Sequence, residues 1–162
     1  MVTQVFLTPD GHAQERSLLD DVLPWVRARD LWIADRNFCT CKFLFGIAAA
    51  NAAFVIRQHG CLKGPLLGQR RSRGRTSTGK VYEQALEVTF GAETRKRRRI
   101  TVQLDQPTSD GDTEIHLLTN LPAREVKAAT VADLYRRRWT IEGRFYEVTQ
   151  TLDCEPNTLA YP

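Results

Sequence analysis

The sequence lacks the features that mark several protein classes. No run of eighteen consecutive apolar residues occurs in its 162 residues, and its N-terminus lacks the basic-then-apolar order of a signal peptide. We therefore expect a soluble, cytoplasmic protein that makes no contact with membranes. The length fits one globular domain with one sizeable core.

Cysteine and histidine are too few and too scattered to indicate a metal or redox centre. Cys39 and Cys41 form a close pair, but zinc sites usually have a gap of about two to four residues and a second pair. Without an export signal, the four cysteines are expected to be reduced thiols. The histidines show no helical i,i+4 pair, and no glycine-rich phosphate loop is present. These absences disfavour zinc, thiol and nucleotide-loop enzymes.

Positive charge is abundant but unevenly spread. The formal net charge is only +4, yet arginines cluster in RRSRGR (70–75), RKRRR (95–99) and YRRRW (135–139). A single basic run is often just a solvated face, but three in a short chain favour a polyanionic partner, most simply nucleic acid. The candidate DNA-binding arginines are Arg36, Arg70, Arg71, Arg73, Arg75, Arg97 and Arg98.

The first third of the chain predicts an α/β arrangement. Apolar runs predict a strand that ends before Asp35 and a second strand after an intervening helix, which makes a βαβ unit with parallel strands. Ligands of α/β sheets lie beyond the carboxyl ends of such strands, so Asp35 is a candidate metal ligand. The predicted elements are a strand over 2–8, a helix over 14–29 kinked at Pro24, a strand over 31–34, a helix over 42–52 and a strand over 53–57.

The rest of the chain changes character. Residues 62–80 are rich in Gly, Ser, Thr and Arg without an apolar period, which predicts a mobile basic loop. Three alternating runs, 81–90, 98–105 and 114–120, predict an antiparallel meander with one wet face. A helix is expected over 131–152. We interpret 61–122 as a β-rich insertion in a single α/β domain.

The predicted terminal helix carries an acid at the border of its apolar stripe. At about 100° per residue, Tyr135, Arg138 and Glu142 fall within an arc of roughly 60°. One interpretation is an intrahelical Arg138–Glu142 pair that contributes about 0.2–0.5 kcal/mol. The other is a divalent metal ion, because hard cations prefer carboxylate oxygens. Asp35 and Glu142 would then be two ligands of a phosphoryl-transfer site.

The sequence resembles a known family at these positions. Tyr135, Arg138 and Glu142 match the start of the Tyr-Arg-Glu-Lys signature of DDE transposases of the bacterial insertion sequence family four, and ADRNF around Asp35 is similar to the segment with that family's second catalytic aspartate. The resemblance implies an RNase H-like catalytic core that binds magnesium, or manganese in its place, through Asp, Asp and Glu. It also implies double-stranded DNA as the partner, with cutting and joining of strands at transposon ends, and a nucleoid-associated bacterial protein.

Carried over by residue, the resemblance makes Asp35 and Glu142 catalytic metal ligands and places Tyr135 and Arg138 beside the DNA backbone. Thr149 stands where the signature has lysine, and no residue clearly matches the first aspartate, since Asp10 lies in a Pro-Asp-Gly turn. We therefore expect a partial catalytic domain over 1–162 with an incomplete core, impaired catalysis and, through an open sheet edge, self-association. Two alternatives remain: a non-enzymatic nucleic-acid-binding module, and an RNase H-like nuclease.

Overall fold

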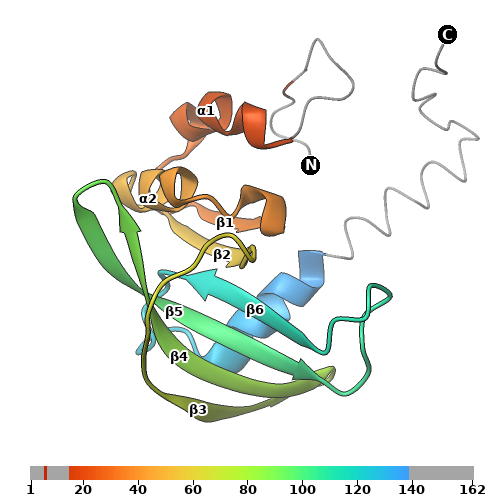
Figure 1. Ribbon diagram of the computed structural model, residues 1–162. Helices are drawn as coiled ribbons and strands as arrows, with labels where there is room; N and C mark the ends of the chain where they lie inside the picture. Colours follow the sequence, from red (N-terminus) through yellow and green to blue (C-terminus); the bar gives the residue numbers. More distant parts are fainter. Residues whose placement is uncertain (1–5, 7–14, 139–162) are drawn as a thin grey trace, which may run out of the picture.

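The computed structural model describes residue 6 and residues 15–138, and these form a mixed α/β fold around one six-stranded sheet (Figure 1). Apart from residue 6, the predicted strand over 2–8 lies outside the described residues, and so do Asp10 and Glu142. The first elements are η1 (Glu15–Leu18), α1 (Leu19–Val22), η2 (Leu23–Trp25), β1 (Leu31–Ala34), η3 (Arg36–Phe38), α2 (Cys41–Ala49) and β2 (Ala53–Arg57). They are followed by β3 (Leu66–Thr76), β4 (Gly79–Phe90), β5 (Glu93–Leu104), β6 (Glu114–Thr119) and a helix described over 128–138.

The sheet combines a parallel pair with an antiparallel meander. Its strand order is β1-β2-β6-β5-β4-β3. β1 and β2 run parallel, with Leu31 opposite Ala53 and Ala34 opposite Ile56, which confirms the predicted βαβ pair. β6 runs antiparallel to β2, and β5, β4 and β3 continue the antiparallel pattern. Region 61–122 therefore extends the same sheet; its status as an insertion stays a prediction.

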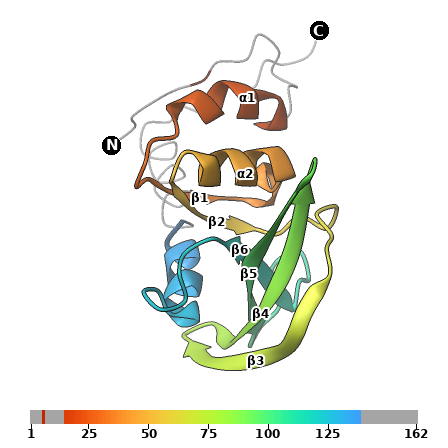
Figure 2. The ribbon, with the colours of Figure 1, turned by 90° about the vertical axis from the view of Figure 1, so that its left-hand side faces the viewer.

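Each face of the sheet has its own apolar core. On one face, Phe54 and Ile56 of β2 and Leu118 of β6 pack with α1 and α2. On the other, Val55 and Leu117 pack with helix 128–138, whose contacts come from Ala128, Val131, Ala132 and Tyr135. We call these the α2 face and the terminal-helix face. Figures 1 and 2 show α1 and α2 at the β1–β2 end of the sheet and helix 128–138 against the other side.

The predicted mobile loop over 62–80 is wrong for most of its length, because Leu66–Thr76 forms β3. Polar side chains hid the strand, since nearly all of them are exposed and no apolar alternation results. Main-chain pairing with β4 holds it, with register shifts where Gly68 and Gly74 adopt positive φ angles of 66° and 98°. Glycine tolerates this conformation without steric cost, which allows the strand to twist around its partner.

The first helix is also shorter than predicted. Helical structure ends at Trp25, and Pro24 lies in the closing 3-10 turn, where its ring ends the helix instead of kinking it. α2 agrees better with the sequence, and it begins after Thr40, whose side chain accepts a hydrogen bond from the Phe43 backbone N–H. Among the described residues, no helix is long and apolar enough to cross a membrane.

Candidate functional site

Asp35 and Arg57 lie side by side at the carboxyl ends of the parallel strands. Ala34 of β1 pairs with Ile56 of β2, so the next residue along each strand is Asp35 and Arg57 respectively. Alternation places both on the terminal-helix face, because Ile33 and Val55, two residues earlier, pack in that core. The short parallel pair thus places an acidic and a basic side chain at one corner of the sheet.

The Asp35 carboxylate is fixed by the backbone that follows it. Asp35 is the N-cap of η3, and its Oδ1 accepts a hydrogen bond from the Arg36 N–H at 2.5 Å. This cap ends β1 and turns the chain away from the sheet. The Arg36 side chain, a predicted DNA-binding group, lies exposed next to it.

The terminal helix brings Tyr135 and Arg138 to the same corner. Ala128, Val131, Ala132 and Tyr135 recur at helical spacing and pack on the sheet, and Tyr135 is only 3% exposed. The Arg138 guanidinium lies 5.5 Å from the centre of the Tyr135 ring. Two residues of the predicted signature therefore face the sheet corner that holds Asp35; the third, Glu142, lies outside the described residues.

A cleft of about 600 Å³ joins these groups. Asp35, Arg57 and Arg138 line it. The β3–β4 turn, with Ser77 and Thr78, and the β5–β6 connection from Leu104 to Asp110 complete its lining. The predicted site residues Asp35 and Arg138 are 103 positions apart in the sequence, yet both line this cleft.

The pKa of Tyr135 reports the charges around the cleft. Burial raises the pKa of its phenol above the usual 10, and the negative charge of Asp35 raises it further. The positive charges of Arg138 and Arg57 act in the opposite direction. Asp35, Arg57, Arg138 and Tyr135 thus interact electrostatically, and Tyr135 stays neutral at physiological pH.

Arg57 is a cleft residue that the sequence analysis missed. Its Nη2 donates to Asp112 Oδ2 at 2.5 Å, and its side chain is only 15% exposed. The bond ties the end of β2 to the β5–β6 connection, and so fixes one wall of the cleft. The sequence could have indicated Arg57 by its position, because it ends the second predicted parallel strand just as Asp35 follows the first. In the structure Ala34 pairs with Ile56, and Asp35 and Arg57 are the next residues.

The predicted DNA-binding arginines of the meander mostly have protein partners. Arg70 pairs with Glu114, Arg75 with Asp105, and Arg73 and Arg98 both with Glu83. These acids neutralise much of the charge that the sequence displays as basic runs. Their role in DNA binding stays a prediction.

Arg97 and Arg98 point to opposite faces of β5. Arg97 lies over the rings of Phe45 and Phe54 on the α2 face. Arg98 donates to Glu83 and also to the backbone carbonyls of Leu121 and Val126, which precede helix 128–138. Arg98 therefore serves the fold, by anchoring the segment that leads into the terminal helix.

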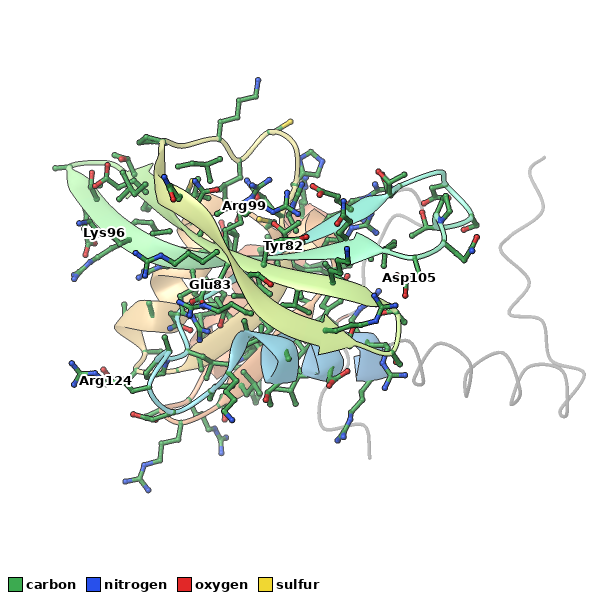
Figure 3. The ribbon with its side chains drawn as sticks, turned by 90° about the horizontal axis from the view of Figure 1, so that it is seen from below. Tyr82, Glu83, Lys96, Arg99, Asp105 and Arg124 are labelled. Carbon is green, nitrogen blue, oxygen red and sulfur yellow. The ribbon has the colours of Figure 1, made fainter. Side chains whose placement is uncertain are left out.

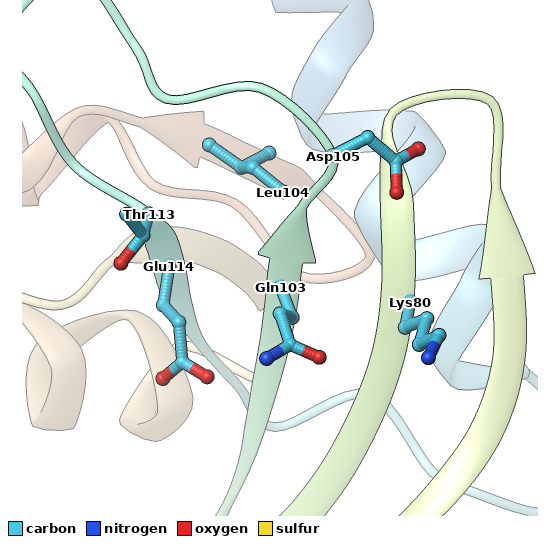
Figure 4. Close-up of a pocket in the computed structure, with 6 residues that line it drawn as sticks. All are labelled: Lys80, Gln103, Leu104, Asp105, Thr113 and Glu114. Carbon is cyan, nitrogen blue, oxygen red and sulfur yellow. The ribbon is translucent and has the colours of Figure 1, made fainter.

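A second hollow of about 340 Å³ lies on the α2 face at the end of β5. Figure 4 shows Lys80, Gln103 and Glu114 side by side on neighbouring strands. Its two acids are already engaged, since Asp105 pairs with Arg75 and Glu114 with Arg70. It is a less suitable reaction centre than the Asp35 cleft.

Asp35 suits a hard cation, but one residue does not make a metal site. With Oδ1 bonded to a backbone N–H, its second carboxylate oxygen has the hard-donor chemistry that magnesium and manganese prefer. Among the residues that the structure describes, no group of three His, Cys, Asp or Glu side chains is arranged to hold a metal ion. A complete site would require Glu142 or another group from outside these residues.

Comparison with known proteins identifies the family. The transposase DDE domain family matches residues 1–159. The chain belongs to the transposase DDE domain family. A Sinorhizobium fredii protein described as "Putative transposase y4zB" is 32% identical over 126 residues, which are 75% of this chain and 33% of that protein. The chain thus spans about a third of the length of this relative. DDE transposases normally use divalent metal ions and act on DNA, which fits a cleft that combines an acid with two arginines.

Proposed function

We propose that this DDE domain is a catalytically impaired form of a DNA transposase of the bacterial insertion sequence family four. Intact members of that family cleave and transfer strands at transposon ends with the help of metal ions. The carrying observation is the cleft that brings together Asp35, Arg57 and Arg138. Family membership and the Tyr135–Arg138–Glu142 spacing support the assignment. The sheet, with a parallel pair ending at Asp35, supports an RNase H-like core.

In the proposed site, Asp35 and Glu142 hold magnesium or manganese. The bound ions would supply an activated oxygen nucleophile and neutralise charge on the phosphodiester. Arg138 and Arg57 border the cleft and orient the scissile phosphate through charge-assisted hydrogen bonds. Tyr135 stays neutral, supports the Arg138 guanidinium with its ring, and keeps that end of the helix packed on the sheet.

The proposed partner is double-stranded DNA, and the proposed location is the bacterial nucleoid region of the cytoplasm. Two of the three family carboxylates are matched in this sequence. We therefore expect the isolated chain to bind DNA without cutting it. Strand cleavage by the purified chain in magnesium or manganese that Glu142→Gln abolishes would contradict this expectation.

Manganese binding tests the metal site directly. The electron paramagnetic resonance signal of unbound Mn²⁺ decreases as the ion binds to protein. Its titration gives the Mn²⁺ affinity of the wild-type chain, of Asp35→Asn and of Glu142→Gln. Each change is expected to weaken binding by about 10-fold or more, because each removes a charged oxygen ligand. Asp21→Asn, at an exposed acid on α1, is the matched control. Equal affinity in all four proteins would overturn the proposed site.

The same experiment separates the transposase from one rival function, and a strand-joining assay separates it from the other. A non-enzymatic nucleic-acid-binding module predicts that neither Asp35→Asn nor Glu142→Gln changes metal binding. An RNase H-like nuclease predicts the same metal dependence as a transposase but hydrolysis without strand joining. Family membership favours the transposase over both.

A further inference from the structure

A third cavity, of about 400 Å³, lies at the other side of the end of β2. Two consecutive residues line different sites: Arg57 lines the Asp35 cleft, and Gln58 lines this cavity. Arg99 of β5, which also lines it, pairs with Leu118, a residue of the core on the α2 face. The cavity is therefore on the opposite face of the sheet from Asp35.

The lining of this cavity combines two cations with two histidine rings. These four side chains border it, and its lining contains no carboxylate. They are His59, Lys63, Arg99 and His116. Glu114 is the nearest acid to His116, with 3.8 Å between Oε2 and Nε2, but its other oxygen already accepts from Arg70.

Arg99 is the central cation of the cavity. Its Nε donates to Gln58 Oε1 at 2.8 Å, which fixes the direction of the guanidinium. Burial lowers the pKa of Arg99, and the nearby charge of Arg70 lowers it further against the opposite effect of Glu114. In the described part of the chain, no carboxylate forms an ion pair with Arg99 or Lys63. A half-buried cation without an acid in contact is stabilised by an incoming anion.

The surface beside the cavity continues across the sheet. His116 of β6, Thr101 of β5 and Tyr82 of β4 form one row of paired residues on the α2 face. The Arg70 guanidinium lies 4.1 Å from the centre of the Tyr82 ring. Figure 3 shows Arg99 and Tyr82 near each other. The next row consists of Glu114, Gln103 and Lys80 (Figure 4), and Glu114 forms an ion pair with Arg70. A polyanionic chain fits this strip better than a single small anion does.

We propose that the cavity formed by His59, Lys63, Arg99 and His116 binds a backbone phosphate of DNA, at a site separate from the Asp35 cleft. The inference rests on the proposed function for its partner. It adds a second contact, on the α2 face, through which the meander holds DNA while Asp35 faces the reacting strand. None of the three basic runs predicted it, because only Arg99 belongs to one of them, and Lys63 and the two histidines lie outside.

Fluorescence polarisation with a labelled DNA duplex tests the site in the full chain. The double variant Lys63→Ala with Arg99→Gln is expected to bind about 10-fold more weakly at low salt. The slope of log affinity against log salt should fall by about 1, since roughly one counterion is released per phosphate contact and the variant removes one such contact. The matched control, Lys127→Ala with Arg124→Ala, removes the same charge from exposed positions. Both precede helix 128–138 on the other face of the sheet, and Figure 3 shows Arg124 away from Arg99. The control should change affinity less than about twofold.

The single variant Lys63→Glu tests the site even if the Arg99 variant does not fold, because Lys63 is exposed and its replacement disturbs no core residue. It should weaken DNA binding several-fold with an unchanged melting temperature. Binding by these variants equal to wild type, or equal to the control, overturns the inference and leaves the proposed function standing. Displacement of DNA by inorganic phosphate at equal phosphate concentration assigns the cavity to small anions and also overturns it. The Mn²⁺ titration of Asp35→Asn reports on the proposed function independently.

Discussion

At the scale of single residues, the candidate site depends on which side chain follows each buried strand. Asp35 could be predicted because a short apolar run stops there, and acids at strand ends are recognisable in a sequence. Arg57 could not, because its meaning depends on the register that sets it beside Asp35 and on its bond to Asp112. Composition suggested free arginines in the meander, but cross-strand acids such as Glu83 and Glu114 pair with them.

His116 makes the clearest pH-dependent contribution. Burial, with the nearby charge of Arg99, lowers its pKa from the ordinary 6.5 to about 4; Glu114 acts in the opposite direction, and Arg70 and Arg57 add to the lowering. The folded protein disfavours the protonated form of His116. The folded state therefore has its full stability above pH 6.5, where the ring is neutral, and loses part of it as pH falls through about 4. The free energy of unfolding should therefore fall by about 2 kcal/mol across this window, allowing for solvent screening.

Chemical denaturation at a series of pH values measures this effect. In His116→Gln the decrease between pH 6.5 and 4 should be smaller, since glutamine does not titrate. Proton NMR of the His116 ring in the wild-type chain should show its midpoint near 4. A midpoint near 6.5 would contradict the burial and charge environment described for this residue.

At the scale of elements, the apolar strands were predictable and the polar one was not. β1 and β2 occur at the predicted residues, because continuous apolar runs bounded by polar residues specify buried strands. β3 was missed because backbone pairing and ion pairs, rather than apolar alternation, hold it on β4. The start of the terminal helix was predicted within a few residues, and its part beyond 138 lies outside the described residues.

Arg98 connects two elements, and its removal should destabilise the fold. Arg98 and Glu83 are each less than 15% exposed, and Arg98 also satisfies the Leu121 and Val126 carbonyls. Arg98→Met should lower the free energy of unfolding by about 3 kcal/mol, because it leaves a buried acid and two carbonyls without this donor. Arg71→Met, at an exposed neighbouring position of β3, should change it by less than about 0.5 kcal/mol. Similar urea midpoints for the two variants would show that Arg98 is not an anchor.

At the scale of the whole molecule, the two edges of the sheet differ. β1 and β3 are the end strands of the described sheet. β3 is rich in arginine and has register shifts, features that discourage pairing with another chain. β1 is short and apolar, and Leu31 on it is 41% exposed. Self-association should therefore involve the β1 edge.

Light scattering after size-exclusion chromatography tests this prediction. The wild-type chain should show oligomers that increase with concentration, and Leu31→Lys should shift it toward monomer by placing a charge on the edge. Leu66→Lys is the matched control, since Leu66 is 46% exposed and begins the other edge strand. A monodisperse wild-type monomer, or equal effects of both changes, would exclude association through β1.

The central claim is that Asp35 and Glu142 belong to one metal site in the cleft. Paramagnetic broadening of backbone NMR signals by substoichiometric Mn²⁺ locates bound metal in the intact chain. Signals of Asp35, Arg57 and Arg138 should broaden first, and this pattern should disappear in Glu142→Gln while remaining in Asp21→Asn. Broadening that is centred elsewhere, or that persists unchanged in Glu142→Gln, would contradict the claim.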